Sequence, residues 1–361
     1  MNEKNDFIQW LAEKDCFLKE VIERKQILFK WFSYLREEEY ENVCNKLYDV
    51  LSRCDEIEYN DSEVAAYVLT HFLDRYYRSL LIFKKLYEMG YLPDQKEMKI
   101  MDIGTGPGMT LYAYSDFMNL LTEYKREKGL LDKIEISLDY VEYSDAFCRF
   151  LHQFTEMGYF DFWNNPEKVV LPFQGTYRDV REFDLSGRLK YDNGCKCRFV
   201  PRSYNVVAYS NFLTSENMVS LCYKQIKEIM FWMRNKGILL IVGGDPQSEK
   251  YVPVYKKIDQ AISEQNYKTK RFYGDCVKVT GAAGLKMSYQ RSEKINNEIA
   301  DFHRIILNKL TNGDLTKIDE RYMKILKAEF EGKGEESWWI SIYMKRSKYR
   351  KKKIINKQEY L

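Results

Sequence analysis

The sequence predicts an α/β protein with a doubly wound, mostly parallel sheet of seven strands, an N-terminal helical region and a helical insertion before the last strand. Three observations support this prediction. Apolar residues recur at helical spacing through the first 90 residues, short apolar runs then alternate with helical stretches, and a glycine-rich turn joins the first run to a helix. Such alternation is typical of βαβ crossovers, in which helices cover both faces of a sheet.

The N-terminal region, residues 1–95, contains few glycines or prolines and is expected to form at least three amphipathic helices. Their apolar patterns cover residues 7–35, 40–54 and 61–90. The third pattern begins at Asp61-Ser62-Glu63, a plausible helix cap, and ends at Gly90. A region this regular is not a linker.

An α/β domain is expected over residues 96–345. Its seven strand candidates are residues 98–104, 133–142, 168–175, 204–212, 237–244, 268–279 and 337–345, with helices around 108–127, 145–157 and 215–235. Helical patterns around 292–311 and 316–331 precede the last strand, so residues 281–336 are expected as a helical insertion, either a cap over the acceptor pocket or an interaction element. Ligands of such sheets bind at the carboxyl ends of the strands.

The composition excludes disordered and fibrous proteins. The 361 residues are 45% hydrophobic, and their formal net charge is +3. The sequence shows neither a long apolar run nor a secretory leader, so a cytoplasmic location without membrane association is expected. Residues 346–361 form a basic tail, which is either a solvated end or a contact for RNA. The sequence gives no indication of the oligomeric state.

Metal binding is not predicted. Cys195 and Cys197 form a single Cys-x-Cys pair, to which Cys222 or Cys276 would have to add ligands. Structural zinc sites usually show two closely spaced pairs. Reduced thiols are therefore expected.

The most informative segment runs from Asp102 through Gly104, Thr105 and Gly106 to Gly108 and leads directly into a helix. Glycines allow tight turns and a close approach of a ligand to the backbone, and the helix start offers unpaired N–H groups. The spacing does not match the dinucleotide fingerprint, and no lysine follows the glycines as in phosphate loops. What remains is an acidic residue in a strand, followed by glycines at alternating positions.

This pattern resembles the first motif of the class I S-adenosylmethionine-dependent methyltransferases, a Rossmann-like fold. The resemblance covers roughly residues 98–280, plus 337–345 as an expected last, antiparallel strand. It implies S-adenosylmethionine as cofactor, with the Gly104–Gly108 turn under its methionine part and Asp102 supporting the turn and the amino group. Glu142, which closes the second strand candidate, matches the family's acid for the ribose hydroxyls, and Asp179 is the candidate beside the adenine.

At the end of the fourth strand candidate, the resemblance places groups beside the transferring methyl. Tyr209 and Asn211 are the candidate catalytic residues, which would hold the acceptor, and Ser210 is assigned to the cofactor. Transfer from a sulfonium mainly requires alignment of the acceptor and exclusion of water. Neither the signature of base amino-group methyltransferases nor the Pro-Cys nucleophile of pyrimidine carbon-5 methyltransferases is found here.

The sequence leaves the acceptor open, with RNA slightly favoured over a small molecule or a protein. A weaker similarity links the chain to the methyltransferase-like family that associates with the mitochondrial small ribosomal subunit and its bacterial relatives, although the cysteine cluster typical of that family is missing. Two alternatives to methyl transfer stay open. One is a noncatalytic RNA-binding or assembly protein with this fold, and the other is an enzyme that transfers an aminopropyl group from the same cofactor.

Overall fold

A computed structural model describes residues 3–53, 58–92, 95–130, 134–162, 175–177, 204–269, 274–281, 283–289, 291–331 and 336–346. Within these ranges, eight strands form one sheet. Seven of them follow the order β3-β2-β1-β4-β5-β8-β6, and β7 pairs with β8 off this path. The strands are β1 (Glu97–Ile103), β2 (Glu135–Val141), β3 (Gly175–Tyr177), β4 (Tyr204–Ser210), β5 (Met233–Gly243), β6 (Asp275–Lys278), β7 (Leu285–Tyr289) and β8 (Glu336–Arg346).

The strands from β3 to β5 are parallel to one another, and β8 runs antiparallel to β5, β6 and β7. This confirms the predicted mostly parallel sheet of seven strands and adds β7, which the sequence analysis did not anticipate. The chain order reverses direction between β1 and β4, where parallel sheets leave a crevice at the carboxyl ends of their strands. We call the ends of β1, β2, β4 and β5 the carboxyl edge.

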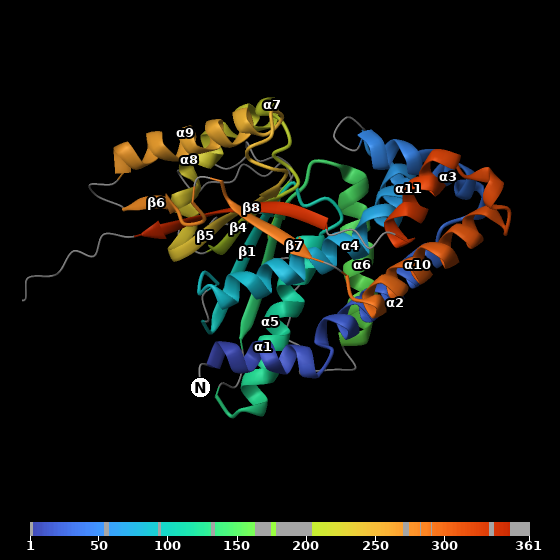
Figure 1. Ribbon diagram of the computed structural model, residues 1–361, viewed down its shortest axis with the longest axis horizontal. Helices are drawn as coiled ribbons and strands as arrows, with labels where there is room; N and C mark the ends of the chain where they lie inside the picture. The colour runs from blue at the N-terminus through green and yellow to red at the C-terminus, as the bar shows by residue number, and fades with distance from the viewer. Residues whose placement is uncertain are drawn as a thin grey trace, which may run out of the picture.

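Helices cover both faces of the sheet (Figure 1). Side chains on alternate positions of the central strands pack against α4, α5 and α6 on one face and against α7, α8 and α9 on the other, as the two-residue period of a strand requires. The helices are α1 (Glu3–Glu13), α2 (Cys16–Ser33), α3 (Glu37–Arg53), α4 (Asp61–Glu88), α5 (Met109–Glu127), α6 (Asp145–Phe162), α7 (Glu216–Leu221), α8 (Tyr223–Trp232), α9 (Val252–Thr269), α10 (Glu293–Thr311) and α11 (Glu320–Glu331).

The N-terminal region is helical, as predicted, with two local differences. The first apolar pattern is divided at Asp15, which adopts a left-handed φ of 50° between α1 and α2. The cap of α4 is Asn60, one residue before the expected start. Its side chain accepts from the Ser62 and Glu63 N–H groups, and Glu63 accepts from the Asn60 N–H in return, a capping box.

The insertion before the last strand is not wholly helical, because it begins with β7. Its helices α10 and α11 pack beside α2 and α3 in a separate helical layer (Figure 1). Phe302 of α10 contacts Phe29 and Phe32 of α2, and Tyr322 of α11 lies 3.4 Å from the Thr70 hydroxyl of α4. The insertion therefore completes a helical unit with the N-terminal region.

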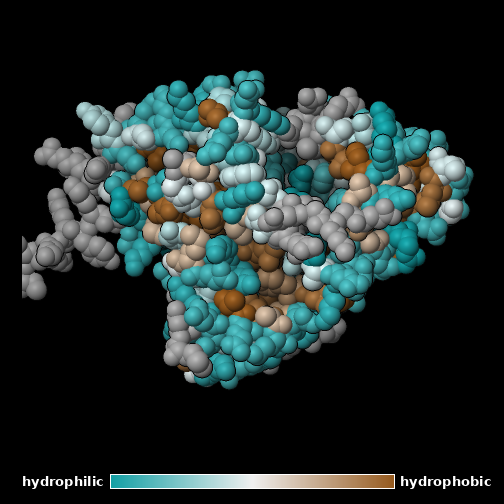
Figure 2. Space-filling view, viewed as in Figure 1, coloured by the Kyte–Doolittle hydropathy of each residue, from teal (hydrophilic) through white to brown (hydrophobic). Residues whose placement is uncertain are grey.

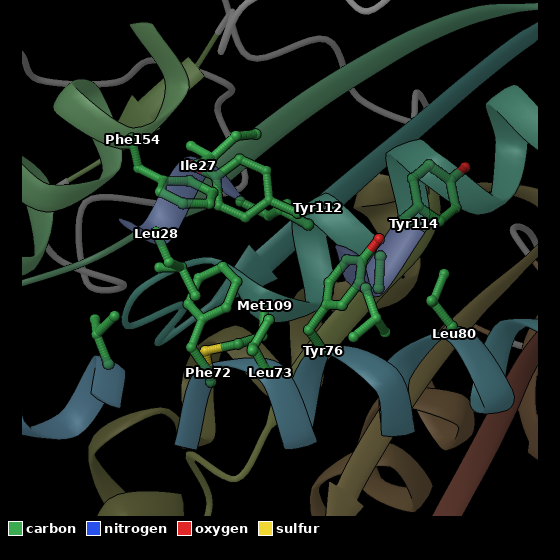
Figure 3. Close-up of a cluster of buried hydrophobic side chains, with 14 of the residues drawn as sticks. Ile27, Leu28, Phe72, Leu73, Tyr76, Leu80, Met109, Tyr112, Tyr114 and Phe154 are labelled. Carbon is green, nitrogen blue, oxygen red and sulfur yellow. The ribbon is translucent and has the colours of Figure 1, made fainter. Parts of the chain in front are cut away.

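A buried ion pair joins this helical unit to the α/β sheet. Arg24 of α2 donates through Nε and Nη2 to the carboxylate of Asp116 on α5, at 2.6 to 2.9 Å, and the Tyr76 hydroxyl of α4 donates to the same carboxylate at 2.6 Å. Around it, Phe72 and Leu73 of α4 lie beside Met109, the first residue of α5 (Figure 3). Helix α4 is thereby fixed next to the glycine turn that precedes α5.

Candidate functional site

The glycine turn links the end of β1 to the start of α5. The Gly104 and Thr105 N–H groups donate to the Val141 carbonyl oxygen at 2.9 and 3.3 Å, which ties the turn to the end of β2. Gly104 and Gly106 adopt φ values of 69° and 54°, a region that residues with a Cβ rarely enter. The glycines are therefore a requirement of the turn itself.

Asp102 lies under this turn, with 1% of its surface exposed. The Thr105 hydroxyl donates to its Oδ2 at 2.7 Å, whereas its Oδ1 is buried and has no hydrogen-bond partner among the described residues. Burial raises the pKa of Asp102 to about 7; the Thr105 hydroxyl opposes this shift, and the charge of Glu142 adds to it. A buried acceptor atom without a donor is suited to a ligand that brings one.

Glu142 follows β2 directly and is 7% exposed. Its Oε2 accepts from the Gly106 N–H at 2.7 Å and its Oε1 from the Ser144 N–H at 2.8 Å. These two backbone donors fix the carboxylate at the carboxyl edge of the sheet. The next side chain, Tyr143, is 79% exposed. The sequence analysis did not include Tyr143 among the candidate site residues, although this tyrosine directly follows the acidic residue at the strand end.

The space above the turn differs between its glycines. A Cβ on Gly104 would lie 2.0 Å from the Phe212 ring, so this ring rests on the backbone of Gly104. A Cβ on Gly106 would meet no described atom within 4 Å. Gly108 is the N-cap of α5 and packs against Tyr112 and Leu151. The turn is therefore open at Gly106 and closed by an aromatic ring at Gly104, a contact that sequence spacing does not reveal.

Ser210 and Asn211 end β4 at the same edge. The exposed Asn211 has a left-handed φ of 53°, and its N–H donates to the Val242 carbonyl oxygen of β5 at 2.9 Å. Its amide nitrogen lies 3.5 Å from the Ser210 hydroxyl oxygen. Asparagine tolerates this backbone conformation better than most residues. Both side chains can contact a ligand at this edge.

The structure places Tyr209 on the opposite face of β4 from Ser210. Its side chain is 0% exposed and belongs to the cluster with Cys222 and Ile258 beneath α7, α8 and α9. Alternation along β4 directs it to this face of the sheet, away from the side chain of Ser210. Its hydroxyl is buried without a hydrogen-bond partner among the described residues, and the Phe212 ring is stacked on its ring. A contact between Tyr209 and an acceptor stays a prediction.

The fold brings most of the predicted site residues together at the carboxyl edge. Asp102, Thr105 and Glu142 are connected through the glycine turn, and Ser210 ends the neighbouring strand. Asp179, Cys195, Cys197 and the basic tail lie outside the described residues. Figure 2 shows a hollow with hydrophilic walls between helices α7–α9 and helices α3 and α11, where the connections into α6 and α7 converge in Figure 1. Among the described helices, none has the length and apolar character needed to cross a membrane.

Comparisons with known proteins find similar proteins among solved structures alone. No protein-family model and no curated protein matches the chain. A phosphoethanolamine N-methyltransferase 2 of Haemonchus contortus, in complex with S-adenosylhomocysteine, is 15% identical with a TM-score of 0.39; the match covers 81% of this chain and 59% of that protein. Coclaurine N-methyltransferase is 11% identical with a TM-score of 0.38, covering 91% and 98% of the two chains. The [4+2]-cyclase SpnF is 9% identical with a TM-score of 0.36, covering 81% and 86%.

Proposed function

We propose that this chain is an S-adenosylmethionine-dependent methyltransferase. The observation that carries the proposal is the buried, partnerless Oδ1 of Asp102 at a glycine turn whose Gly106 is open. A ligand ammonium group would supply the missing donor, and its positive charge would stabilise the ionised carboxylate that burial disfavours. Glu142, at the end of the adjacent strand, offers two acceptor oxygens to a pair of neighbouring hydroxyls.

The residues present fit this cofactor. Asp102 would hold its amino group, the Gly104–Gly108 turn its methionine part, and Glu142 its ribose. The N-terminus of α5, directly after the turn, adds unpaired N–H groups and a positive dipole end that favour a carboxylate. When bound, the cofactor supplies an activated methyl group on a sulfonium. The protein then has to align the acceptor and exclude water.

Asn211 is the proposed acceptor-holding residue. Its exposed amide can both accept from and donate to an acceptor, and its backbone is fixed to β5 by the bond to Val242. Ser210 lies beside it at the end of β4. We propose positioning by these two groups, with the acceptor class left open between RNA, for which the basic tail is the argument, and a smaller molecule.

Calorimetric titration with S-adenosylhomocysteine tests the cofactor site. Gly106→Arg should abolish binding, because the arginine would fill the open space above the turn. Gly129→Arg is the matched control: Gly129 has a φ of 65° and an equally open Cβ position, but lies beyond the far end of α5. Binding by the wild type and the control, together with loss in Gly106→Arg, is the expected result. A folded wild type that does not bind would refute the proposal.

One observation favours a second function, a noncatalytic protein with this fold. The Phe212 ring already occupies the face of Gly104 on which the cofactor would lie. If the Phe212 ring stays in this position, it occupies the place of the cofactor and prevents its binding. The two functions differ in the effect of Phe212→Ala. In an enzyme this substitution should strengthen cofactor binding, whereas in a scaffold the variant should not bind the cofactor.

A further inference from the structure

The residues that lead into α4 contact the loop that carries Glu142. Tyr59 and Asn60 directly precede α4, and Ser144 directly precedes α6, two positions after Glu142. The Ser144 hydroxyl donates to the Tyr59 carbonyl oxygen at 3.4 Å, across 85 positions of the chain. The N-terminal helical region therefore reaches the carboxyl edge at the acidic residue that we assign to the ribose.

Ser144 connects Tyr59 to the Glu142 carboxylate. The Ser144 N–H donates to Glu142 Oε1 at 2.8 Å, and the Ser144 hydroxyl accepts from the Phe147 N–H at 3.3 Å, as an N-cap residue of α6 does. Because the hydroxyl oxygen accepts from Phe147, its hydrogen can be donated to the Tyr59 carbonyl oxygen. The position of Ser144, and with it one of the two donors that fix Glu142, therefore depends on Tyr59.

Two side-chain contacts reinforce this connection between α4 and α6. The centres of the Tyr59 and Phe147 rings are 4.7 Å apart, and Arg149 donates to Oδ1 of Asp61 through Nε at 3.2 Å and Nη2 at 2.7 Å. The Arg149–Asp61 pair is exposed on both sides, so it contributes little to the free energy of the contact. The packing of the Tyr59 ring on Phe147 is the stronger of the two contacts.

The backbone at Tyr59 is itself fixed by its neighbours. Asn60 and Glu63 form the capping box of α4, and the Asn60 carbonyl oxygen accepts from the Val64 N–H at 2.9 Å. Glu63 also lies 2.8 Å from Nζ of Lys46 on α3. The Tyr59 carbonyl therefore has a defined position relative to the pair of helices α3 and α4.

The Glu142 carboxylate requires support from both sides, because another carboxyl group is close to it. Besides burial, the charge of Glu142 raises the pKa of Asp102, which shows that the two groups interact. The Gly106 N–H donates to Oε2 of Glu142 from the side of the glycine turn, and the Ser144 N–H donates to Oε1 from the side of α6. Loss of the donor on the α6 side would let this repulsion move the carboxylate.

We propose that Tyr59 is a positioning residue for Glu142. Tyr59 holds Ser144 in place, and Ser144 fixes the carboxylate in the orientation that receives the two ribose hydroxyls of the cofactor. A residue of the N-terminal helical region thereby sets part of the cofactor affinity of the α/β domain. The ribose role of Glu142 rests on the proposed function, whereas the dependence of Glu142 on Tyr59 does not.

Amide hydrogen exchange, followed by nuclear magnetic resonance in the protein without ligand, tests the positioning itself. Tyr59→Ala should speed the exchange of the Ser144 and Gly106 N–H groups about fivefold, since both groups donate to Glu142. The Gly104 N–H lies in the same turn as Gly106 but donates to the end of β2, so its exchange should stay unchanged.

Tyr48→Ala is the matched control. Tyr48 is a partly buried tyrosine of α3, and the Arg321 guanidinium of α11 lies 3.8 Å from the centre of its ring. This variant should leave the exchange of all three N–H groups unchanged. Ser144→Ala removes the hydroxyl that meets Tyr59 but keeps the Ser144 N–H, so it should reproduce the effect if Tyr59→Ala does not fold. Unchanged exchange at Ser144 and Gly106, or an equal effect of the control, overturns the proposal.

Calorimetry with S-adenosylhomocysteine tests the consequence for the cofactor. Tyr59→Ala should weaken binding about fivefold, and Tyr48→Ala should weaken it less than about twofold. In a Glu142→Gln background, Tyr59→Ala should have no further effect, because the residue that it positions has already lost its role. Additive losses would show that Tyr59 acts by another route and would overturn the proposal. A wild type that does not bind, with the exchange differences intact, would refute the proposed function and leave the positioning of Glu142 standing.

Discussion

Substitution of Asp102 by asparagine tests two consequences of the burial of this carboxyl group: the pH dependence of stability and the binding of the cofactor. The wild-type carboxyl has a pKa of about 7 in the folded protein and 3.8 as its ordinary value. Between these values the folded state binds more protons than the unfolded state, so stability falls as the pH rises through this window. Asparagine does not titrate and escapes this loss. Its amide alters the local hydrogen bonds, but that effect does not depend on pH.

The magnitude follows from the two pKa values. For a group shifted from 3.8 to about 7, linkage gives a loss of about 3 kcal/mol in the free energy of unfolding between about pH 5 and about pH 8. Urea denaturation of both proteins at these two pH values measures it. The stability of Asp102→Asn relative to the wild type should rise by this amount on going to the higher pH. A difference that stays constant between the two pH values would refute the assignment of a raised pKa.

The same substitution tests the ligand side of the site. A cofactor ammonium group that pairs with Asp102 lowers its pKa, so the wild type should release about half a proton per ligand bound near pH 7. Calorimetry in buffers of different ionisation enthalpy measures this release. Asp102→Asn should bind S-adenosylhomocysteine about 10- to 100-fold more weakly, with no proton released. Proton release that persists in the variant would place the titrating group elsewhere.

Three further substitutions test other contacts. Phe212→Ala should strengthen S-adenosylhomocysteine binding about fivefold in calorimetry, because the ligand no longer has to displace a ring stacked on Tyr209; unchanged affinity would show that the ring does not compete. Glu142→Gln should weaken the same binding at least about tenfold, because one of the two backbone N–H groups that donate to Glu142 then faces an amide NH2 group. The control Glu135→Gln, at an exposed position, should leave the binding unchanged. Arg24→Met should lower the free energy of unfolding, measured by urea denaturation, by about 3 to 5 kcal/mol, because Asp116 then stays buried without its partner charge. Arg149→Met, which breaks an exposed ion pair, should lower it by less than about 1 kcal/mol.

The glycine turn illustrates what local sequence can determine. Alternating glycines after an acidic strand residue require positive φ values, and these depend on the chain within a few residues. The strand and helix periods around them are equally local, so most of the elements were predictable, although β7 and the break between α1 and α2 were not. Glu142 was predictable for the same reason, because the end of β2 lies next to the end of β1 once the sheet is parallel.

Two local features escaped the sequence analysis although their signals were present. Asn60 is a strong N-cap residue three positions before Glu63, but Asp61 and Ser62 compete for the same role. β7 is only five residues long and lies in a segment otherwise rich in helical pattern. Tyr209 lies on the opposite face of β4 from Ser210, as the two-residue period of a strand already indicated.

The sequence by itself determined the class of fold, most of its strands and helices in their order, and the position of a glycine turn after β1. Each of these follows from periodicity and backbone sterics, which act over short stretches of chain. Only the tertiary structure decided that Phe212 closes Gly104, that Asp102 keeps a buried oxygen without a donor, and that Arg291 reaches Asp74 of α4. These contacts join residues far apart in the chain, and their geometry depends on how whole elements pack, which no local pattern encodes.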